Sequence, residues 1–309
     1  MEIKVIHAGM QTTVQDLGRK GHLAQGVSIG GAVDPIALRL ANLLVGNAED
    51  LPALEITLTA PELEFEKDGW IAVCGARFEG VSSWRPIRVY EGDRLKFGSR
   101  VQGCRAYLSI CGGFDVEPIM GGRGTFLPAA FGGFEGRALR DGDLIHSVPS
   151  ERVLTGHWSI DERVLPRYSR EPTVSVIAGS QAGEFGDAFY AERFAVTARS
   201  NRMGIRLEGP ALTRTSGTEL ISSAVAPGTV QVPPDGNPIV LMADAQTLGG
   251  YPRIAHVALA DIPLLAQLAP GDGVRFKRIT VAEAHALARA EERGLALLRQ
   301  GLAEKIRSA

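Results

Sequence analysis

Short apolar runs separated by glycine or proline dominate the first half of the chain, a pattern typical of β-strands joined by tight turns. One segment differs, because apolar residues from Ile36 to Leu44 recur at helical spacing. Asp34 and Pro35 provide an N-cap and a first-turn proline for this helix, and Gly46 ends it. The strands are expected at residues 54–58, 63–65, 70–74, 87–90, 94–97 and 106–111. These elements predict a closed or sandwiched β domain with one helix.

A polar stretch that contains Pro166 and Pro172 separates this half from a second half with the same pattern. Residues 150–172 show no sustained hydrophobic period, so we expect the domain boundary there. Further strands are expected at residues 174–178, 194–197, 205–207, 228–232, 239–241 and 274–276, with a short helix capped by Asp261. The sequence therefore predicts one β domain over residues 1–165 and a second over residues 166–280.

The remaining segment, residues 281–309, is rich in Ala, Leu, Glu and Arg, and its leucines recur at helical spacing. It predicts a C-terminal helix that Gly294 would bend or break. A short internal echo also links the two halves. A Gly-Asp turn leads into a predicted strand at residues 92–93 and again at residues 271–272, and residues 142–143 offer a third copy. This echo suggests that the halves are related by duplication.

Composition and charge narrow the classes of function. The chain has 309 residues, 33 of them Lys or Arg and 35 Asp or Glu, with a formal net charge of -2. Because like charges form no blocks, neither nucleic acid nor a membrane is expected as a partner. The N-terminus is interrupted too early for a secretory signal and no apolar run is long enough to span a membrane, so we expect a cytoplasmic protein. The three cysteines lack metal-type spacing and are expected to be buried thiols.

Several common catalytic motifs are missing from the sequence. It contains no phosphate-binding loop of the G-x-x-x-x-G-K-[ST] type and no G-x-S-x-G motif. The six histidines show no zinc-type spacing, so no metal site is expected. No methionine neighbours a lysine, so biotin is not expected to be attached covalently to this chain.

Polar residues and glycines gather in five clusters within this β framework. Residues 12–19 place Asp16 and Arg19 on one turn, where they could orient a substrate carboxylate or pair with each other. Residues 30–34 precede the helix, and N-capping by Asp34 explains them better than anion binding does. In residues 231–236 the Pro-Asp-Gly sequence indicates a turn.

The other two clusters favour a ligand site, because polar side chains bunched between strands are costly to bury and unnecessary for a hairpin. They comprise Asn201 and Arg202 within residues 200–204, and Asp244, Gln246, Thr247 and Tyr251 within residues 244–252. An arginine offers bidentate binding of an anion, and a double glycine lets the backbone approach a ligand. The residues alone thus predict a two-domain β protein with a polar cleft for a small anionic ligand, and they leave the reaction open.

Six sequence blocks together carry a family resemblance. They are T-T-V-Q-D-L-G-R (12–19), G-G-A-V-D (30–34), A-F-G-G-F-E-G-R-A-L (130–139), S-N-R-M-G (200–204), Q-V-P-P-D-G (231–236) and D-A-Q-T-L-G-G-Y-P (244–252). In this order they resemble the biotin-dependent carboxyltransferase family, also called allophanate hydrolase subunit 2, and within it the branch formed by the C subunits of 5-oxoprolinases. The chain departs from the family pattern at residues 60–61 and 179–181, and most clearly in one loop: residues 121–126 read G-G-R-G-T-F where relatives often show G-S-R-S-T-D, although Arg123 is retained.

The resemblance implies two tandem cyclophilin-like β-barrel domains and an enzyme that works with separate A and B subunits. It implies that this complex uses ATP to open the lactam of 5-oxo-L-proline and form L-glutamate. The implied catalytic residues are Asp16 and Asp244, and the implied substrate-binding residues are Arg19, Asn201, Arg202, Gln246, Thr247 and Tyr251. In this scheme the arginines hold the substrate carboxylate or a phosphate, the amides orient the ring and a carboxylate moves a proton.

Two alternatives stay open at this point. The first is the carboxyltransferase part of a biotin-dependent urea carboxylase, although such enzymes usually carry fused biotin carboxylase and carrier domains. The second is a non-enzymatic protein that binds a kinase-inhibitor-like partner related to the B subunit. This reading predicts that Arg202 and Gln246 can be replaced without loss of function.

Overall fold

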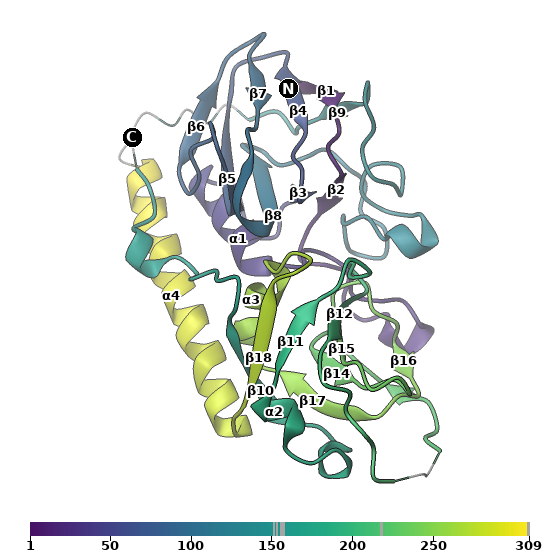
Figure 1. Cartoon of the computed structure of the whole chain (residues 1–309). Helices are drawn as coiled ribbons and strands as arrows, with labels where there is room; N and C mark the ends of the chain where they lie inside the picture. Colours follow the sequence, from purple (N-terminus) through teal and green to yellow (C-terminus); the bar gives the residue numbers. More distant parts are fainter. Residues whose placement is uncertain (151, 153, 155–157, 217–218, 308–309) are drawn as a thin grey trace. The chain divides into compact units, whose positions relative to one another are not determined.

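The computed structural model describes residues 1–150, 152, 154, 158–216 and 219–307, and the chain divides into two compact units (Figure 1). Unit 1 comprises Met1–Lys20, Gly30–Pro166 and Gly294–Ala309, and unit 2 comprises Gly21–Ile29 and Arg167–Arg293. Parts of two predicted segments lie outside the described residues: positions 151, 153 and 155–157 of the boundary stretch, and positions 308 and 309 of the C-terminal segment. The chain thus passes between the units several times, near residues 20, 30, 166 and 293.

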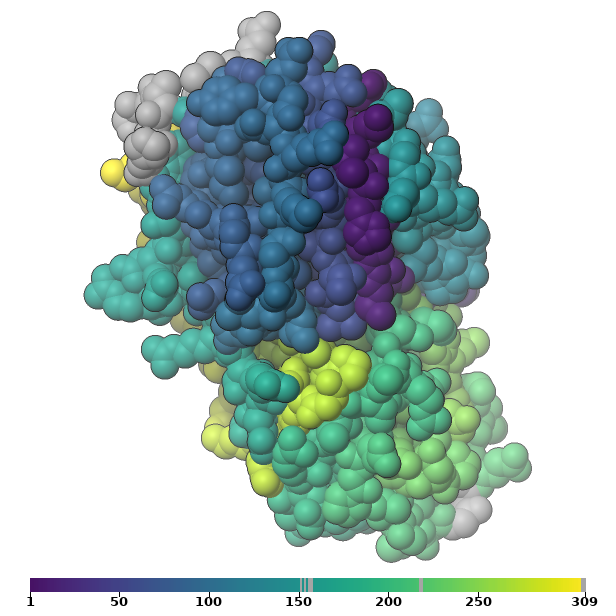
Figure 2. Space-filling view, turned by 45° about the horizontal axis from the view of Figure 1, so that its top comes forward, coloured from purple at the N-terminus to yellow at the C-terminus, as the bar shows by residue number. Residues whose placement is uncertain are grey.

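Two sheets build unit 1. The first has the order β7 (Arg94–Lys96), β4 (Glu62–Phe65), β1 (Glu2–His7) and β9 (Leu144–His146), and the second has the order β2 (Gln11–Gln15), β3 (Ala53–Thr57), β8 (Arg100–Ile110), β5 (Gly69–Phe78) and β6 (Pro86–Val89). All of these strand pairs are antiparallel. In the space-filling view the purple N-terminal residues form a narrow strip on the surface of this unit (Figure 2). This strip fits the alternation along β1, where Ile3 and Val5 are buried and Lys4 is exposed.

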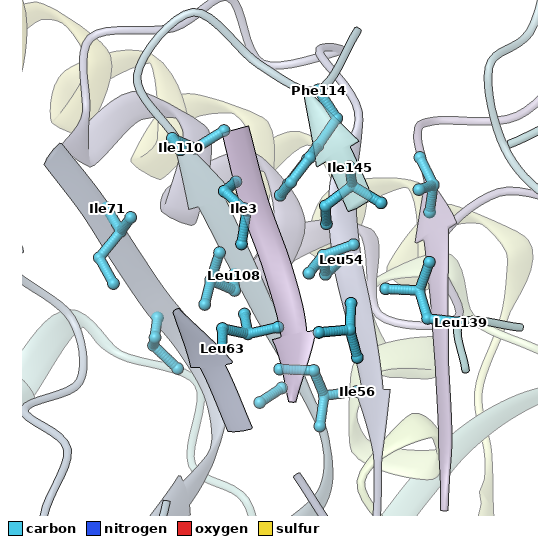
Figure 3. Packing of buried hydrophobic residues seen from close by; sticks show 14 of the residues in the cluster. Ile3, Leu54, Ile56, Leu63, Ile71, Leu108, Ile110, Phe114, Leu139 and Ile145 are labelled. Carbon is cyan, nitrogen blue, oxygen red and sulfur yellow. The ribbon is translucent and has the colours of Figure 1, made fainter. Parts of the chain in front are cut away.

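The hydrophobic core of unit 1 joins side chains from both sheets. Ile3 and Leu63 from the first sheet lie among Leu54, Ile71 and Leu108 from the second, and all five are at most 1 % exposed (Figure 3). Burial of each such side chain contributes about 1.5–3 kcal/mol relative to leaving it in water. Because alternate residues of a strand point to opposite faces, the residues between these core positions must face the other side of the five-stranded sheet.

That other face of the five-stranded sheet is polar although it is buried. It carries Thr13, Gln15, Glu55, Arg105, Tyr107 and Ser109, each at most 5 % exposed. Helix α1 (Pro35–Leu44) packs against β5 and β8. The helix begins as predicted, because the Asp34 side chain accepts a hydrogen bond from the N–H of Ala37 at 3.0 Å. Within this layer Tyr107 donates to Glu55 at 2.6 Å, and both side chains accept hydrogen bonds from the loop that precedes α1, so the layer fixes the geometry of that loop.

A closed barrel forms the centre of unit 2. Its strand order is β10 (Thr173–Ala178), β17 (Arg253–Val257), β14 (Thr229–Gln231), β15 (Ile239–Leu241), β12 (Gly204–Glu208), β11 (Arg193–Val196) and β18 (Gly273–Arg278), and β18 pairs in parallel with β10 to complete the ring. Strands β13 (Ser223–Ala224) and β16 (Leu248–Gly249) form a separate two-stranded sheet. Unit 2 also contains the short helices α2 (Ala188–Ala191) and α3 (Ile262–Ala266). The mainly β fold with a closed barrel confirms the predicted fold class.

The three Gly-Asp turns share one local geometry. Gly92, Gly142 and Gly271 all have positive φ, between 82° and 91°, where glycine is favoured. In each turn the aspartate side chain accepts a hydrogen bond from the backbone N–H three residues earlier, at 2.7–2.9 Å. The sequence echo therefore reflects a repeated turn that leads from a loop into a strand.

Helix α4 (Val281–Arg307) runs through Gly294 without a break, so of the two expected effects of this glycine the break does not occur. Its buried residues, among them Leu295 and Leu302, supply packing that offsets the low helix propensity of glycine, about 1 kcal/mol. Asp261 does not cap α3 with its side chain either, because its Oδ2 accepts the N–H of Ser175 at 2.6 Å. Among the described residues, no helix combines the length and apolar character needed to cross a membrane.

Candidate active site

In unit 1 the candidate residues Asp16 and Arg19 follow directly after β2. Asp16 is 6 % exposed, and its Oδ1 and Oδ2 accept hydrogen bonds from the backbone N–H groups of Gly18 (2.8 Å) and Arg123 (2.5 Å). Arg19 is 1 % exposed, donates from Nη2 to the carbonyl oxygen of Gly124 at 2.5 Å, and lies over the ring of Phe131 at 4.7 Å. Both side chains therefore bind the glycine-rich segment 121–136.

This glycine-rich segment and the residue before it contain strained backbone. Met120, Ala130 and Glu135 have φ between 51° and 54°, and they are three of the five non-glycine residues with positive φ in the described chain. Such conformations cost about 1–3 kcal/mol each and persist only where the surroundings enforce them, often at functional sites. A Cβ atom on Gly124 would lie 2.8 Å from Asp16 Oδ1. The close approach explains why the segment contains glycine at this position.

The second sequence cluster, residues 30–34, is clamped beside Asp16. The backbone N–H groups of residues 32–34 donate in turn to the carbonyl oxygen of Asp16 (2.8 Å), to Glu55 Oε2 (3.0 Å) and to the Tyr107 hydroxyl (2.8 Å). Tyr107 in turn donates to Glu55 at 2.6 Å, and burial raises the pKa of its hydroxyl well above the ordinary value. The polar layer beneath α1 thus positions the Asp16 backbone, a role that the sequence analysis did not assign to Glu55 or Tyr107.

In unit 2 the structure brings Arg202 and Asp244 together. The guanidinium donates from Nε and Nη2 to Oδ2 and Oδ1 of Asp244 at 2.8 and 2.9 Å, and the two side chains are 3 % and 1 % exposed. The backbone N–H of Asp244 also donates to the carbonyl oxygen of Arg202 at 3.0 Å. A bidentate pair with this burial fixes the loop 200–204 against residues 244–252.

Asn201, Gln246 and Thr247 are neighbours of this ion pair in the sequence, but no contact of their side chains with it is seen in the described part of the chain. Asn201 is exposed, and its Oδ1 accepts the backbone N–H groups of Met203 (2.8 Å) and Gly204 (3.4 Å), which shapes the turn. Gln246 is exposed and Thr247 is half-buried. These two side chains are therefore accessible to a ligand, whereas the Asn201 carbonyl oxygen is used within its own turn.

Tyr251, which is 47 % exposed, lines a cavity of about 680 Å³. The wall includes two of the six sequence blocks, as residues 232–236 and 250–252, and also residues 211–214, which carry no recognisable motif. Gln231 lies next to this wall in sequence and is 1 % exposed, and its Nε2 has no hydrogen-bond partner among the described residues. From the sequence, the block that contains Gln231 was expected only to form a turn.

The candidate residues thus form two clusters in different units. Asp16 and Arg19 belong to unit 1, and the other six candidates belong to unit 2. One segment from early in the sequence reaches the second cluster: Ser28, which belongs to unit 2, donates from its hydroxyl to the carbonyl oxygen of Ala245 at 2.5 Å. Within the described part of the chain, no group of three or more His, Cys, Asp or Glu side chains is arranged to hold a metal ion. Cys74, Cys104 and Cys111 are buried free thiols, as predicted.

Comparison with known families and proteins agrees with this architecture. The family described as "Carboxyltransferase domain, subdomain A and B" matches residues 25–278. The match covers most of the chain, including both of the blocks that form the second cluster. The chain therefore belongs to the carboxyltransferase domain family, which confirms the family resemblance seen in the sequence.

Within this family the chain is similar to proteins named as the C subunit of 5-oxoprolinase. It is 44 % identical to the one from Escherichia coli (strain K12), over 91 % of this chain and 93 % of that protein. It is 36 % identical to the one from Haemophilus influenzae, over 98 % of this chain and 99 % of that protein.

Among solved structures, a urea amidolyase from K. lactis shares the fold with a TM-score of 0.89 and 30 % identity. The match covers 96 % of this chain but only 20 % of that much longer protein.

Proposed function

We propose that the chain is the C subunit of an ATP-dependent 5-oxoprolinase, which opens the lactam of 5-oxo-L-proline to L-glutamate together with A and B subunits. The observation that carries the proposal is the similarity, along nearly the whole of both chains, to proteins with that name. In the longer urea amidolyase relatives the matching region is only a part, 18 % of the one from Lachancea kluyveri. The proposal places the reaction in the cytoplasm, where ATP is supplied.

The chemistry requires activation of the substrate. A lactam carbonyl is a poor electrophile, and transfer of a phosphoryl group from ATP to its oxygen makes the carbon electrophilic and the oxygen a better leaving group. Water then adds to that carbon and the ring C–N bond opens, which leaves the side-chain acyl phosphate of glutamate. A second water hydrolyses this acyl phosphate to glutamate and phosphate, so the net reaction consumes ATP and two water molecules and releases ADP, phosphate and glutamate. ATP enters as a co-substrate of the complex, and we assign no residue of this chain to it.

The residues of this chain are proposed to bind and orient the substrate and to move a proton. Arg19 and Arg202 provide positive charge for a carboxylate or phosphate, and Asp16 or Asp244 handles the proton. The geometry refines these roles, because the Arg202 guanidinium is bound in bidentate fashion by the Asp244 carboxylate. We therefore propose that this pair acts on substrate by holding the loop in place, while the exposed Gln246 contacts the ring amide.

The test is glutamate release from 5-oxo-L-proline and ATP by the chain mixed with its A and B counterparts, with a control that lacks the chain. Gln246→Ala is expected to raise KM about 3–10-fold, the effect of losing one or two hydrogen bonds to substrate. Gln300→Ala is the matched control, because Gln300 is an exposed glutamine on α4 whose side chain donates to Glu304 at 3.2 Å, one turn further along the helix. Turnover that does not need the chain would refute the proposal.

A second candidate, the carboxyltransferase part of a urea carboxylase, is favoured by the 30–32 % identity to urea amidolyases and a putative urea carboxylase. It predicts carboxylation of urea when a biotin carboxylase and a biotinylated carrier are supplied. It also predicts no release of glutamate from 5-oxo-L-proline. The same protein preparation can be assayed for both reactions.

A further inference from the structure

Helix α4 is shared by the two units, whose boundary falls between residues 293 and 294. Its beginning is capped within unit 2, where Glu283 Oε2 accepts the backbone N–H of Thr280 at 2.7 Å. Its second part is fixed within unit 1, where Arg299 Nε lies 2.7 Å from Glu49 Oε1. Each part of the helix is therefore held by the unit to which it belongs.

The middle of α4 has little support from packing. Ala284 and Leu295 are buried, at 6 % and 3 % exposed. Of residues 285–294 between them, none is buried and only two are half-buried. A helical segment with few buried contacts is held mainly by its own backbone hydrogen bonds, so it deforms at a lower cost than a packed one.

Gly294 stands at the end of this weakly supported stretch, directly at the unit boundary. Neither the available space nor the backbone requires glycine there, because no described atom lies within 4 Å of the position of a Cβ and φ is not in the left-handed region. Glycine has the widest conformational freedom of all residues and lowers the stability of a helix relative to alanine. The residue type at this position thus favours bending at the expense of helix stability.

Glycine also marks two of the other three places where the chain passes between the units. These crossings lie at residues 20–21, 29–30 and 166–167. Gly21 and Gly30 stand at the first two, with φ of 96° and 63°, and the third crossing follows Pro166. Only 37 of the 309 residues are glycine, so its presence at three of four crossings is a second feature that points to motion. Hinge motions are absorbed by a few residues at positions of this kind.

We infer that Gly294 is a hinge point at which α4 bends while units 1 and 2 change their relative orientation. The motion itself does not depend on which reaction is catalysed. Its role in turnover rests on the proposed function, which assigns substrate contacts to residues of both units. In enzymes with such hinges, opening and closure commonly limit the rate of turnover.

Distances between two spin labels, measured by pulsed electron–electron double resonance on the full chain, report the motion directly. Glu91→Cys in unit 1 and Glu208→Cys in unit 2 provide exposed label sites, and the three native cysteines are buried. The wild-type background is expected to show a broad distribution of distances. Gly294→Ala is expected to narrow it, because alanine favours the unbent helix about five-fold over glycine.

The matched control is Gly301→Ala. Gly301 is an exposed glycine of the same helix, it lies within unit 1, and no described atom is found within 4 Å of the position of its Cβ. Both substitutions are expected to raise the melting temperature by about 2 °C, so stability does not distinguish them. With the A and B counterparts present, Gly294→Ala is expected to lower kcat by up to about five-fold, whereas Gly301→Ala leaves both kcat and the distance distribution unchanged.

The outcomes separate the hinge from the proposed function. A single narrow distance distribution in the wild-type background, or equal distributions in the two alanine variants, would overturn the hinge. A loss of turnover in Gly294→Ala without narrowing would overturn it as well, because the inference requires both effects. Narrowing in Gly294→Ala, combined with no release of glutamate by the wild type, would keep the hinge and count against the proposed reaction alone.

Discussion

Replacing Asp244 with asparagine would distinguish a structural role of this residue from a catalytic one. The substitution keeps the shape of the side chain but removes the negative charge opposite Arg202, in a pair that is 3 % and 1 % exposed. Loss of one partner of a buried ion pair costs about 3–5 kcal/mol, because the remaining charge stays buried without compensation. The amide oxygen can still accept one hydrogen bond, so we expect a loss of about 3 kcal/mol in the free energy of unfolding.

The assay is urea denaturation followed by circular dichroism, with the double variant Arg202→Met, Asp244→Leu as the comparison. The double variant removes both charges. Its loss of stability is therefore expected to be smaller, by at least about 1 kcal/mol, than the sum of the losses measured for Arg202→Met alone and Asp244→Leu alone. Glutamate release is measured at a temperature where each variant is folded. This separates loss of structure from loss of catalysis.

One result would refute the reasoning. If Asp244→Asn unfolds within about 1 kcal/mol of the wild type, the ion pair does not hold the loop, whatever its geometry. If the same stable variant loses turnover by about 100-fold or more, Asp244 is catalytic, as the sequence analysis predicted.

Two further substitutions have defined outcomes. Gly124→Ala places a Cβ 2.8 Å from both Asp16 Oδ1 and Gln15 Oε1, so the Asp16 carboxylate must shift. We expect a loss of turnover of about 10-fold or more, measured at a temperature where the variant is folded, and unchanged turnover would exclude a role for the position of this carboxylate. Burial lowers the pKa of His256, so the unfolded chain binds its proton more readily and stability falls as the pH drops through about 6.5 and below. The melting temperature of the wild type should therefore fall more steeply between pH 7 and 5.5 than that of His256→Gln, and parallel curves would contradict this.

The sequence predicted the elements whose pattern is local. Helix α1 has its cap, its proline and its apolar stripe within residues 34–46, and most predicted strands differ from the observed ones by a few residues at most. Strand β2 was missing from the expected strands, because Thr13 and Gln15 face the buried polar layer. A strand that is buried on both faces, one of them polar, shows no alternation of apolar and polar residues to reveal it.

The candidate site was predicted as a set of residues but not as a set of contacts. Arg202 and Asp244 are 42 residues apart, so no spacing rule could show that they bind each other. The sequence also could not show that Glu55 and Tyr107 reach the backbone beside Asp16, because those hydrogen bonds depend on the register between β3 and β8. The sequence shows which polar residues each loop contains, but only the fold shows which other loop or strand those residues contact.

The segment Gly21–Ile29 has a consequence for how this protein can be divided. It lies early in the chain but belongs to unit 2, where Ser28 is 4 % exposed and donates to the carbonyl oxygen of Ala245. A fragment that starts at residue 167 would lack this donor and would leave that carbonyl group open beside the Asp244 loop. Unit 2 is therefore built from two separate stretches of the chain. Residues 167–293 alone do not complete it, and a recombinant protein that replaces these residues must also carry a compatible 21–29 segment.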